Sequence, residues 1–273
     1  MSKKWLEKQI KGLLLDITGV LYESGCDTAI AGSVDAIKRL RQNGIPFRFC
    51  TNETQRTTDS LVSKLRRFGY ELDKSEVIAP APAVRHMLIK QNLRPYLLIY
   101  PELMPEFADI DQSNANCVVV GDAAQHFTYD AVNKAFQLLL SMKDPLLISM
   151  GKGKYYKEGN ELVLDLGAYT AALEYATDNK AVIMGKPAKE YYMTAIDSMN
   201  LKPEDVVMIG DDINSDVGGA QQMDMRGLLV RTGKYRPSDE NHTTVKPDAI
   251  VNNLADAVNQ ILTHRAIANN SDS

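Results

Sequence analysis

The chain has 273 residues, of which 44% are hydrophobic and 24% are charged, and its formal net charge is −4 at pH 7. A chain of this size buries a full hydrophobic core as one large domain or two modest ones. The slightly acidic balance argues against an extended basic surface, so we expect no binding to nucleic acid or to membranes. Its cysteines, Cys26, Cys50 and Cys117, form no CxxC motif, which argues against a disulfide scaffold or a zinc site.

The N-terminal region carries no targeting signal that we recognise. The apolar run behind the charged first residues stops at Asp16, so it makes neither a signal peptide nor a membrane span. We therefore expect a cytoplasmic protein, and presence in the nucleus stays open.

Short apolar runs, typical of strands, alternate with helical patterns along the chain. Strands are expected at 12–15, 45–50, 96–100, 117–121, 146–150, 181–184, 205–209, 227–230 and 249–251. Helices are expected at 33–42 (with Ser33 as N-cap), 61–69, 129–142, 168–177, 188–199, from 217 onward and at 254–262. The segment 152–160 is expected to be a loop or hairpin turn, and the polar end from Ala266 is expected to fray.

The alternation of strands and helices predicts an α/β fold built from βαβ units. Two prolines, Pro80 and Pro82, interrupt the first series of elements, and a second series follows. We predict a Rossmann-like parallel-sheet core domain formed by 1–78 and 185–273, with a second, inserted α/β cap domain at 79–184.

Four of the predicted strands end in residues with matching chemistry. In chain order these are Asp16-x-Thr18, Thr51-Asn52, Lys186, and Asp211-Asp212 with Asp216. Strand ends of one parallel sheet share an edge, where α/β proteins bind their ligands. Carboxylates suit Mg²⁺, and a nucleophile, a cation and hydroxyl and amide donors suit phosphoryl transfer.

Each motif also has an ordinary structural interpretation. An Asp after a strand commonly opens a turn, Thr51-Asn52 can cap a following helix, and a lone Lys186 is commonly solvated. Asp212, Asn214 and Asp216 resemble the start of a calcium loop, but the glycine and bidentate glutamate of that loop are missing.

Taken together and in this order, the motifs resemble those of the haloacid dehalogenase-like phosphatases with a large cap inserted between the second and third motifs. The resemblance rests on Asp16-Ile-Thr-Gly-Val-Leu-Tyr22, Phe49-Cys-Thr-Asn-Glu53, Gly151-Lys-Gly-Lys-Tyr-Tyr-Lys-Glu158, Gly185-Lys-Pro187 and Arg231-Thr-Gly-Lys-Tyr-Arg-Pro-Ser-Asp-Glu240. It covers nearly the whole chain.

The resemblance implies a role for each motif. Asp16 is the nucleophile that forms an aspartyl-phosphate, and the catalytic set is Asp16, Thr18 and Lys186. Mg²⁺ is bound by Asp16, the main-chain carbonyl of Thr18 and Asp211, with outer-shell roles for Asp212 and Asp216. The substrate-binding set is Asp16, Ile17, Thr18, Thr51, Asn52 and Lys186. A homodimer joined through the caps is also implied.

One position departs from the family pattern. Most of these phosphatases have a second Asp two residues after the nucleophile, which serves as general acid and base, and this chain has Thr18 there. A threonine hydroxyl does not supply a proton at neutral pH as a carboxylic acid does.

Three functional hypotheses follow. The first, which the resemblance implies, is a Mg²⁺-dependent phosphohydrolase that acts on P–N bonds (phospholysine, phosphohistidine, imidodiphosphate) and on inorganic pyrophosphate. The second is a small-molecule phosphomonoesterase for a sugar or cofactor phosphate. The third is a phosphoprotein-binding module with low turnover, which the loss of the second Asp favours. The partner is thus a phosphate-bearing small molecule or a phosphoprotein.

Overall fold

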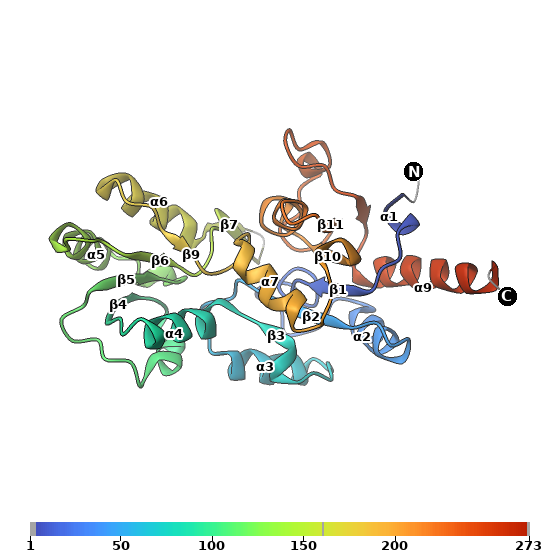
Figure 1. Ribbon diagram of the computed structural model, residues 1–273, viewed down its shortest axis with the longest axis horizontal. Coiled ribbons are helices and arrows are strands. Elements are labelled where there is room, and N and C mark those ends of the chain that lie inside the picture. The colour runs from blue at the N-terminus through green and yellow to red at the C-terminus, as the bar shows by residue number, and fades with distance from the viewer. Residues whose placement is uncertain (1–3, 160, 272–273) are drawn as a thin grey trace. The chain divides into compact units, whose positions relative to one another are not determined.

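The computed structural model describes residues 4–159 and 161–271 (Figure 1). The chain divides into two compact units. The first unit comprises the chain up to Cys50, Val62–Ile78 and the chain from Tyr192 onward, and the second comprises Thr51–Leu61 and Ala79–Tyr191. Each unit is built on its own parallel sheet.

The sheet of the first unit has the strand order β12–β11–β10–β1–β2–β3, and its neighbouring strands are parallel. The strands are β1 (Gly12–Leu15), β2 (Phe47–Cys50), β3 (Val77–Ile78), β10 (Val206–Gly210), β11 (Arg226–Val230) and β12 (Ala249–Val251). From β1 the chain adds β2 and β3 on one side, and later returns to add β10 on the other. The boundary between β1 and β10 is therefore the switch point at which α/β sheets place ligands.

Helices cover this sheet, which explains why its central strands are apolar on both faces. Leu13, Leu14 and Leu15 of β1 are fully buried. The helices along this part of the chain are α1 (Lys4–Glu7), α2 (Ser33–Gln42), α3 (Thr58–Arg67), η1 (Lys74–Glu76), α7 (Lys189–Asp197), η4 (Pro203–Asp205), η5 (Ile213–Gly218), α8 (Gly219–Gln221), η6 (Pro237–Asn241) and α9 (Leu254–Ser271). Helices α2 and α9 pack side by side, and Arg39 donates to Asn259 between them (Figure 1).

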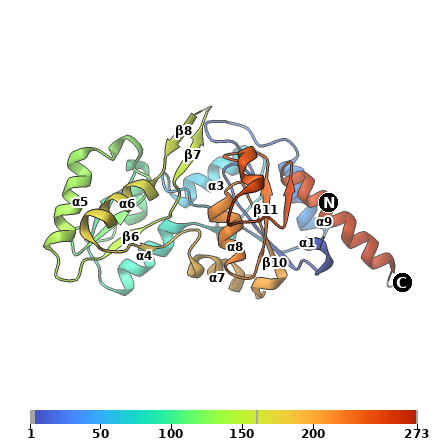
Figure 2. The same ribbon diagram turned by 90° about the horizontal axis from the view of Figure 1, so that it is seen from above.

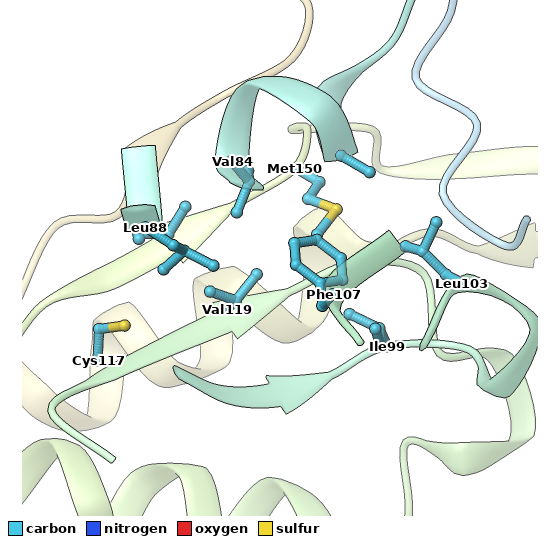
Figure 3. Packing of buried hydrophobic residues seen from close by; sticks show 10 residues of the cluster. Val84, Leu88, Ile99, Leu103, Phe107, Cys117, Val119 and Met150 are labelled. Carbon is cyan, nitrogen blue, oxygen red and sulfur yellow. The ribbon is translucent and has the colours of Figure 1, made fainter. Parts of the chain in front are cut away.

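The second unit is a three-layer structure around the parallel sheet β4–β5–β6–β9. Its strands are β4 (Pro95–Leu98), β5 (Cys117–Val120), β6 (Leu147–Ser149) and β9 (Val182–Ile183). One face packs against α4 (Pro80–Lys90) and η2 (Pro101–Phe107), and Figure 3 shows Val84, Leu88 and Phe107 gathered around Val119. The other face packs against α5 (Tyr129–Ser141) and α6 (Leu166–Thr177). A short helix, η3 (Ala124–His126), precedes α5.

An antiparallel hairpin completes the second unit. Its strands, β7 (Tyr155–Glu158) and β8 (Glu161–Leu164), lie side by side in Figure 2. Tyr156 is opposite Val163, while Leu162 and Leu164 are 52% and 62% exposed.

The predicted mixed α/β fold with parallel sheets is confirmed, and three details of the sequence analysis are corrected. The region of Pro80 and Pro82 is not an interruption but the first turn of α4, because proline suits the start of a helix, where its missing N–H is not needed. The segment 152–160, expected to be a loop or hairpin turn, does belong to a hairpin, but Tyr155–Glu158 form its strand β7 rather than a turn. The expected fraying from Ala266 is wrong, because α9 continues to Ser271.

A fourth correction concerns Ser33. Gly32, and not Ser33, is the N-cap of α2, and the Ser33 hydroxyl contacts the carbonyls of Leu21 and Ile30 instead. The predicted domain boundaries stay a prediction. Within the residues that the structure describes, no helix has the length and hydrophobicity needed to cross a membrane.

Candidate active site

Asp16 follows β1 directly and is 7% exposed. Its N–H donates to the carbonyl of Ile209 in β10 at 2.9 Å, which ties the end of β1 to the neighbouring strand. The chain then turns sharply, because the N–H groups of Val20 and Leu21 donate to the Ile17 carbonyl. The sheet and this turn hold Asp16 at the switch point.

Three buried carboxylates meet at this point. One oxygen of each of Asp16, Asp211 and Asp216 lies within 4.8 Å of the others. Asp211 follows β10, and Asp216 lies in the turn η5, so the cluster joins the ends of two adjacent strands. Buried carboxylates at this spacing repel one another unless a cation or protons offset their charge.

The two oxygens of Asp211 have different surroundings. Its Oδ2 accepts the N–H of Lys234 at 2.8 Å. A Cβ built at Gly19 or Gly233 would lie 2.1 or 2.0 Å from that oxygen, so both positions need glycine. Its Oδ1 is buried and accepts no hydrogen bond from residues 4–159 or 161–271.

Charge and burial act together on this cluster. Burial raises the pKa of Asp211 well above its usual range, and the neighbouring carboxylates of Asp16 and Asp216 raise it further, against the lowering effect of Lys234. A divalent cation bound to the cluster would remove this penalty. An unpartnered carboxylate oxygen beside two more carboxylates is the hard, oxygen-only donor set that Mg²⁺ prefers.

Asp212 shapes the turn that carries Asp216. Its Oδ1 accepts the N–H groups of Asn214 and Ser215, while its Oδ2 accepts a hydrogen bond from Lys234 Nζ at 3.2 Å. Burial opposes its ionisation, but Lys234 and the two N–H groups outweigh burial and lower its pKa to about 2. In return, Asp216 Oδ2 accepts the Asp212 N–H at 3.1 Å. Asp212 therefore stabilises the turn and is not one of the three clustered carboxylates.

Thr18 lies on the turn after Asp16 and is partly exposed. Its hydroxyl donates to the hydroxyl of Tyr22 at 3.2 Å. Tyr22 is buried, and the ammonium group of Lys64 lies 4.0 Å from its ring centre. The Thr18 side chain is thus engaged with the Tyr22 hydroxyl and not with a second carboxylate.

The second unit holds Thr51, Asn52 and Lys186. Thr51 Oγ1 accepts the Glu53 N–H at 2.9 Å, and its carbonyl accepts the hydroxyl of Tyr191 at 2.7 Å. The alternative that this motif caps the next helix is wrong, because α3 begins only at Thr58. Lys186 is 2% exposed, so it is not the ordinary solvated lysine of the alternative interpretation.

The Asn52 amide is paired with the main chain of Lys186. Its Oδ1 accepts the Lys186 N–H at 2.8 Å, and its Nδ2 donates to the Lys186 carbonyl at 2.9 Å. Gly185 permits this approach, because a Cβ there would lie 2.7 Å from Asn52 Oδ1. The structure therefore brings Asn52 and Lys186 together in one unit, as it brings Asp16, Asp211 and Asp216 together in the other.

A polar cluster anchors the hairpin within the second unit. Gln55 Nε2 donates to Asp122 Oδ2 at 2.7 Å and to the Tyr156 hydroxyl at 3.3 Å, so it bridges the two side chains. Burial raises the pKa of Asp122, and burial and the Asp122 charge raise that of Tyr156, which stays protonated at neutral pH. This cluster ties β7 to the segment that begins at Thr51.

The sequence analysis missed several residues around these sites. Lys234, Gly233 and Gly19 surround Asp211, and Gln55 and Asp122 hold Tyr156. A signal for Lys234 exists, since Thr232-Gly-Lys234 follows strand β11 just as the four motifs follow theirs. No comparable signal marks Gln55 or Asp122.

Comparison with known proteins defines the class. The family model described as "haloacid dehalogenase-like hydrolase" matches residues 13–123, and that described as "HAD-hyrolase-like" matches residues 183–257. The chain belongs to the haloacid dehalogenase-like hydrolases, and it is an enzyme of the phosphatase type.

Individual relatives narrow this assignment. The chain is 52% identical to phospholysine phosphohistidine inorganic pyrophosphate phosphatase from Danio rerio, with 94% of this chain and 96% of the relative covered. It is also 52% identical to the protein of that name from Homo sapiens, over 93% of this chain and 95% of the relative. The crystal structure of a 4-nitrophenylphosphatase from Thermotoga maritima superposes with a TM-score of 0.81 at 26% identity, over 92% of this chain and 97% of that one. The family and enzyme class predicted from the sequence are confirmed.

Proposed function

We propose that this chain is a Mg²⁺-dependent phosphohydrolase that cleaves P–N bonds and inorganic pyrophosphate through a phosphorylated Asp16. The carboxylate cluster of Asp16, Asp211 and Asp216 is the observation on which the proposal depends most. The names of the two relatives that are 52% identical to this chain support the substrate class.

The cluster fits a magnesium ion. Asp16, the main-chain carbonyl of Thr18 and Asp211 would hold it, and Asp216 would act through water or by orienting the loop. The buried Asp211 Oδ1, which accepts no hydrogen bond from the residues that the structure describes, supports this assignment, since a buried oxygen without a partner otherwise costs stability. Bound Mg²⁺ would offset the negative charge of the phosphate and of the nucleophile.

The chain's own residues supply the nucleophile, the groups that bind phosphate and the charge that neutralises it. The Asp16 carboxylate attacks phosphorus, and the bond from phosphorus to the leaving nitrogen or oxygen breaks as the acyl phosphate forms. Water then hydrolyses the acyl phosphate and regenerates Asp16. We assign phosphate oxygens to Thr51, Asn52 and the Ile17–Thr18 turn, and charge neutralisation to Lys186, as the family pattern implies.

Thr18 favours substrates whose leaving group needs no acid from the enzyme. Its hydroxyl is a poor proton donor at neutral pH, and it is engaged with Tyr22. Pyrophosphate expels phosphate, and a phosphoramidate protonated on nitrogen expels a neutral amine. Phosphate and a neutral amine are both better leaving groups than an alkoxide. The absence of an acid at residue 18 therefore supports P–O–P and P–N substrates.

A phosphate-release panel with and without Mg²⁺ tests the proposal. The panel contains pyrophosphate, imidodiphosphate, phosphohistidine, phospholysine, a sugar phosphate and 4-nitrophenyl phosphate. We expect Mg²⁺-dependent release, fastest from the first four. Release that ignores Mg²⁺, or that is fastest from the sugar phosphate, would contradict the proposal.

A small-molecule phosphomonoesterase is the second candidate. The 4-nitrophenylphosphatase with a TM-score of 0.81 favours it, because the name of that enzyme describes an aryl phosphate substrate. A low-turnover phosphoprotein-binding module is disfavoured, because a pure binder gains nothing from three buried carboxylates facing one another.

We also propose a cytoplasmic homodimer. The apolar side chains of Leu162 and Leu164 on the hairpin are exposed, and a second copy would cover such a surface. Sedimentation of the full chain with Leu164→Lys tests this, since we expect the variant to become a monomer.

A further inference from the structure

The segment after β11, formed by Thr232, Gly233 and Lys234, contacts both halves of the carboxylate site. We call it the 232–234 segment. Because β11 pairs with β10, the loop that follows β11 lies next to the loop that carries Asp211 and Asp212. The segment belongs to a stretch that resembles the family but has no assigned role in the chemistry above.

On one side the 232–234 segment contacts the turn after Asp16. The Thr232 hydroxyl donates to the Gly19 carbonyl, and the Gly233 N–H donates to Glu23 Oε1 at 3.0 Å. The two glycine backbones are in close contact, since a Cβ on Gly233 would lie 2.6 Å from Gly19 Cα. The segment is thus fixed to the turn that follows the nucleophile.

On its other side the segment contacts the acidic loop. The Lys234 N–H donates to Asp211 Oδ2, and Lys234 Nζ donates to Asp212 Oδ2. Both groups of this ion pair are largely buried, with 21% and 15% of their side-chain surface exposed. One residue therefore contacts the two successive aspartates through two different groups.

These contacts determine how the Asp211 carboxylate is oriented. Its Oδ2 is enclosed by Gly19, Gly233 and the Lys234 N–H, so the carboxylate cannot rotate without losing a hydrogen bond or colliding with backbone. Its Oδ1 is left without a hydrogen-bond partner among the described residues. A carboxylate with one oxygen held and the other open is prepared to bind a cation, as partners behind metal ligands commonly ensure.

We propose that Thr232 and Lys234 are positioning residues that hold Asp211 in its metal-binding orientation and link it to the turn of the nucleophile. This inference rests on the proposed metal site. The proposal predicts that Lys234 strengthens Mg²⁺ binding. Charge alone predicts the opposite, because a nearby ammonium group by itself repels Mg²⁺. The hydrogen bond to Asp211 comes from the main-chain N–H of Lys234, so the ammonium group acts indirectly, through its ion pair with Asp212, which holds the 232–234 segment in place. Removing the ammonium group should therefore weaken Mg²⁺ binding by loosening this segment, although it also removes a positive charge.

The test is the affinity of the full chain for Mg²⁺, measured by isothermal titration calorimetry and by the rise of Tm with Mg²⁺ concentration. We expect Lys234→Met to raise the Kd about 10–100-fold, as is usual for partners of metal ligands. We expect Thr232→Val, which removes only the hydroxyl donor, to raise it about 10-fold, and Thr232→Ser to restore it to within about twofold. Circular dichroism and metal-free Tm show whether each variant folds.

The outcomes separate this inference from the proposed function. If the wild type binds no Mg²⁺, the metal site and the inference are both wrong. If the wild type binds Mg²⁺ and Asp211→Asn does not, while Thr232→Val and Lys234→Met bind like the wild type, only the positioning role is wrong. Tighter binding by Lys234→Met would show that Lys234 acts by charge alone and would also overturn it.

Discussion

Asn52 and Lys186 are joined by two hydrogen bonds, although they are 134 positions apart in the sequence. The side-chain amide of Asn52 hydrogen-bonds both the N–H and the carbonyl of Lys186. In a sheet, the main chain of a neighbouring strand would make these two hydrogen bonds. Because the lysine itself is buried, the direction of its side chain depends on this backbone. The pairing indicates that Asn52 positions Lys186, in addition to its proposed contact with a phosphate oxygen.

Asn52→Ala removes both hydrogen bonds that the side chain makes to the main chain of Lys186. We expect a loss of about 2–3 kcal/mol in the free energy of unfolding. We also expect a fall of about 10²-fold in kcat/KM for pyrophosphate, since a displaced catalytic group costs this much. Chemical denaturation and phosphate release measure the two effects.

Asn43→Ala is the matched control for this variant. Asn43 Nδ2 also donates to a main-chain carbonyl, that of Arg39, but at an exposed position at the end of α2. We expect both quantities to change little. If Asn52→Ala keeps kcat/KM within about twofold of the wild type, the pairing does not position the lysine.

Asp16→Asn should abolish turnover and leave the fold intact. The amide is not a nucleophile, and it removes one of three neighbouring buried carboxylates, so the metal-free protein should be as stable as the wild type or more so. Phosphate release and metal-free Tm are measured together. The control is Asp27→Asn, which changes an exposed carboxylate of the same segment. Substantial turnover by Asp16→Asn would rule out an aspartyl-phosphate on this residue.

Tyr156→Phe should change the ranking of substrates more than the chemistry. It removes the hydroxyl that accepts a hydrogen bond from Gln55, and with it a tie between β7 and the segment that starts at Thr51. We expect kcat/KM for phosphohistidine and pyrophosphate to shift by different factors, with a stability cost of about 1 kcal/mol.

Tyr175→Phe, at a tyrosine that is 89% exposed on α6, is the control for Tyr156→Phe and should change neither quantity. An equal change for every substrate, or no change, would show that the hairpin does not select substrates.

The sequence predicts those features that depend on residues close together in the chain, and it fails for contacts between residues far apart in the chain. The strand that ends in Asp16 and the helix of residues 33–42 are local patterns, and both are where they were expected. Strand β8 was missed because Glu161–Leu164 is short, charged at its start and largely exposed, so it shows no buried apolar run. The role of Lys234 toward Asp211 and the pairing of Asn52 with Lys186 join residues far apart in the chain. Such contacts depend on strand order and on glycines that permit close approach, which no local pattern encodes.

The last prediction concerns Thr18 and the leaving group. An alkoxide needs a proton as its bond to phosphorus breaks, and the Thr18 hydroxyl, which donates to the Tyr22 hydroxyl, does not supply one. We therefore expect the wild type to be fast on P–N and P–O–P substrates, slow on alkyl phosphates, and intermediate on aryl phosphates with acidic phenols. General acid catalysis is worth about 10²–10⁴-fold, so the difference in rate between these substrates and alkyl phosphates should be easy to measure.

Thr18→Asp introduces the missing acid and should raise alkyl phosphate turnover more than pyrophosphate turnover. Thr18→Asn, of similar size but without an ionisable proton, is the control and should not narrow the gap. The measurement is kcat/KM against the pKa of the leaving group for all three proteins, with the Mg²⁺ requirement determined for each, because an added carboxylate beside Asp16 can alter metal binding. A steep dependence in the wild type that becomes shallower only in Thr18→Asp supports the assignment. If the wild-type rate does not depend on the pKa of the leaving group, or if all substrates respond equally to Thr18→Asp, residue 18 does not explain the choice of substrate.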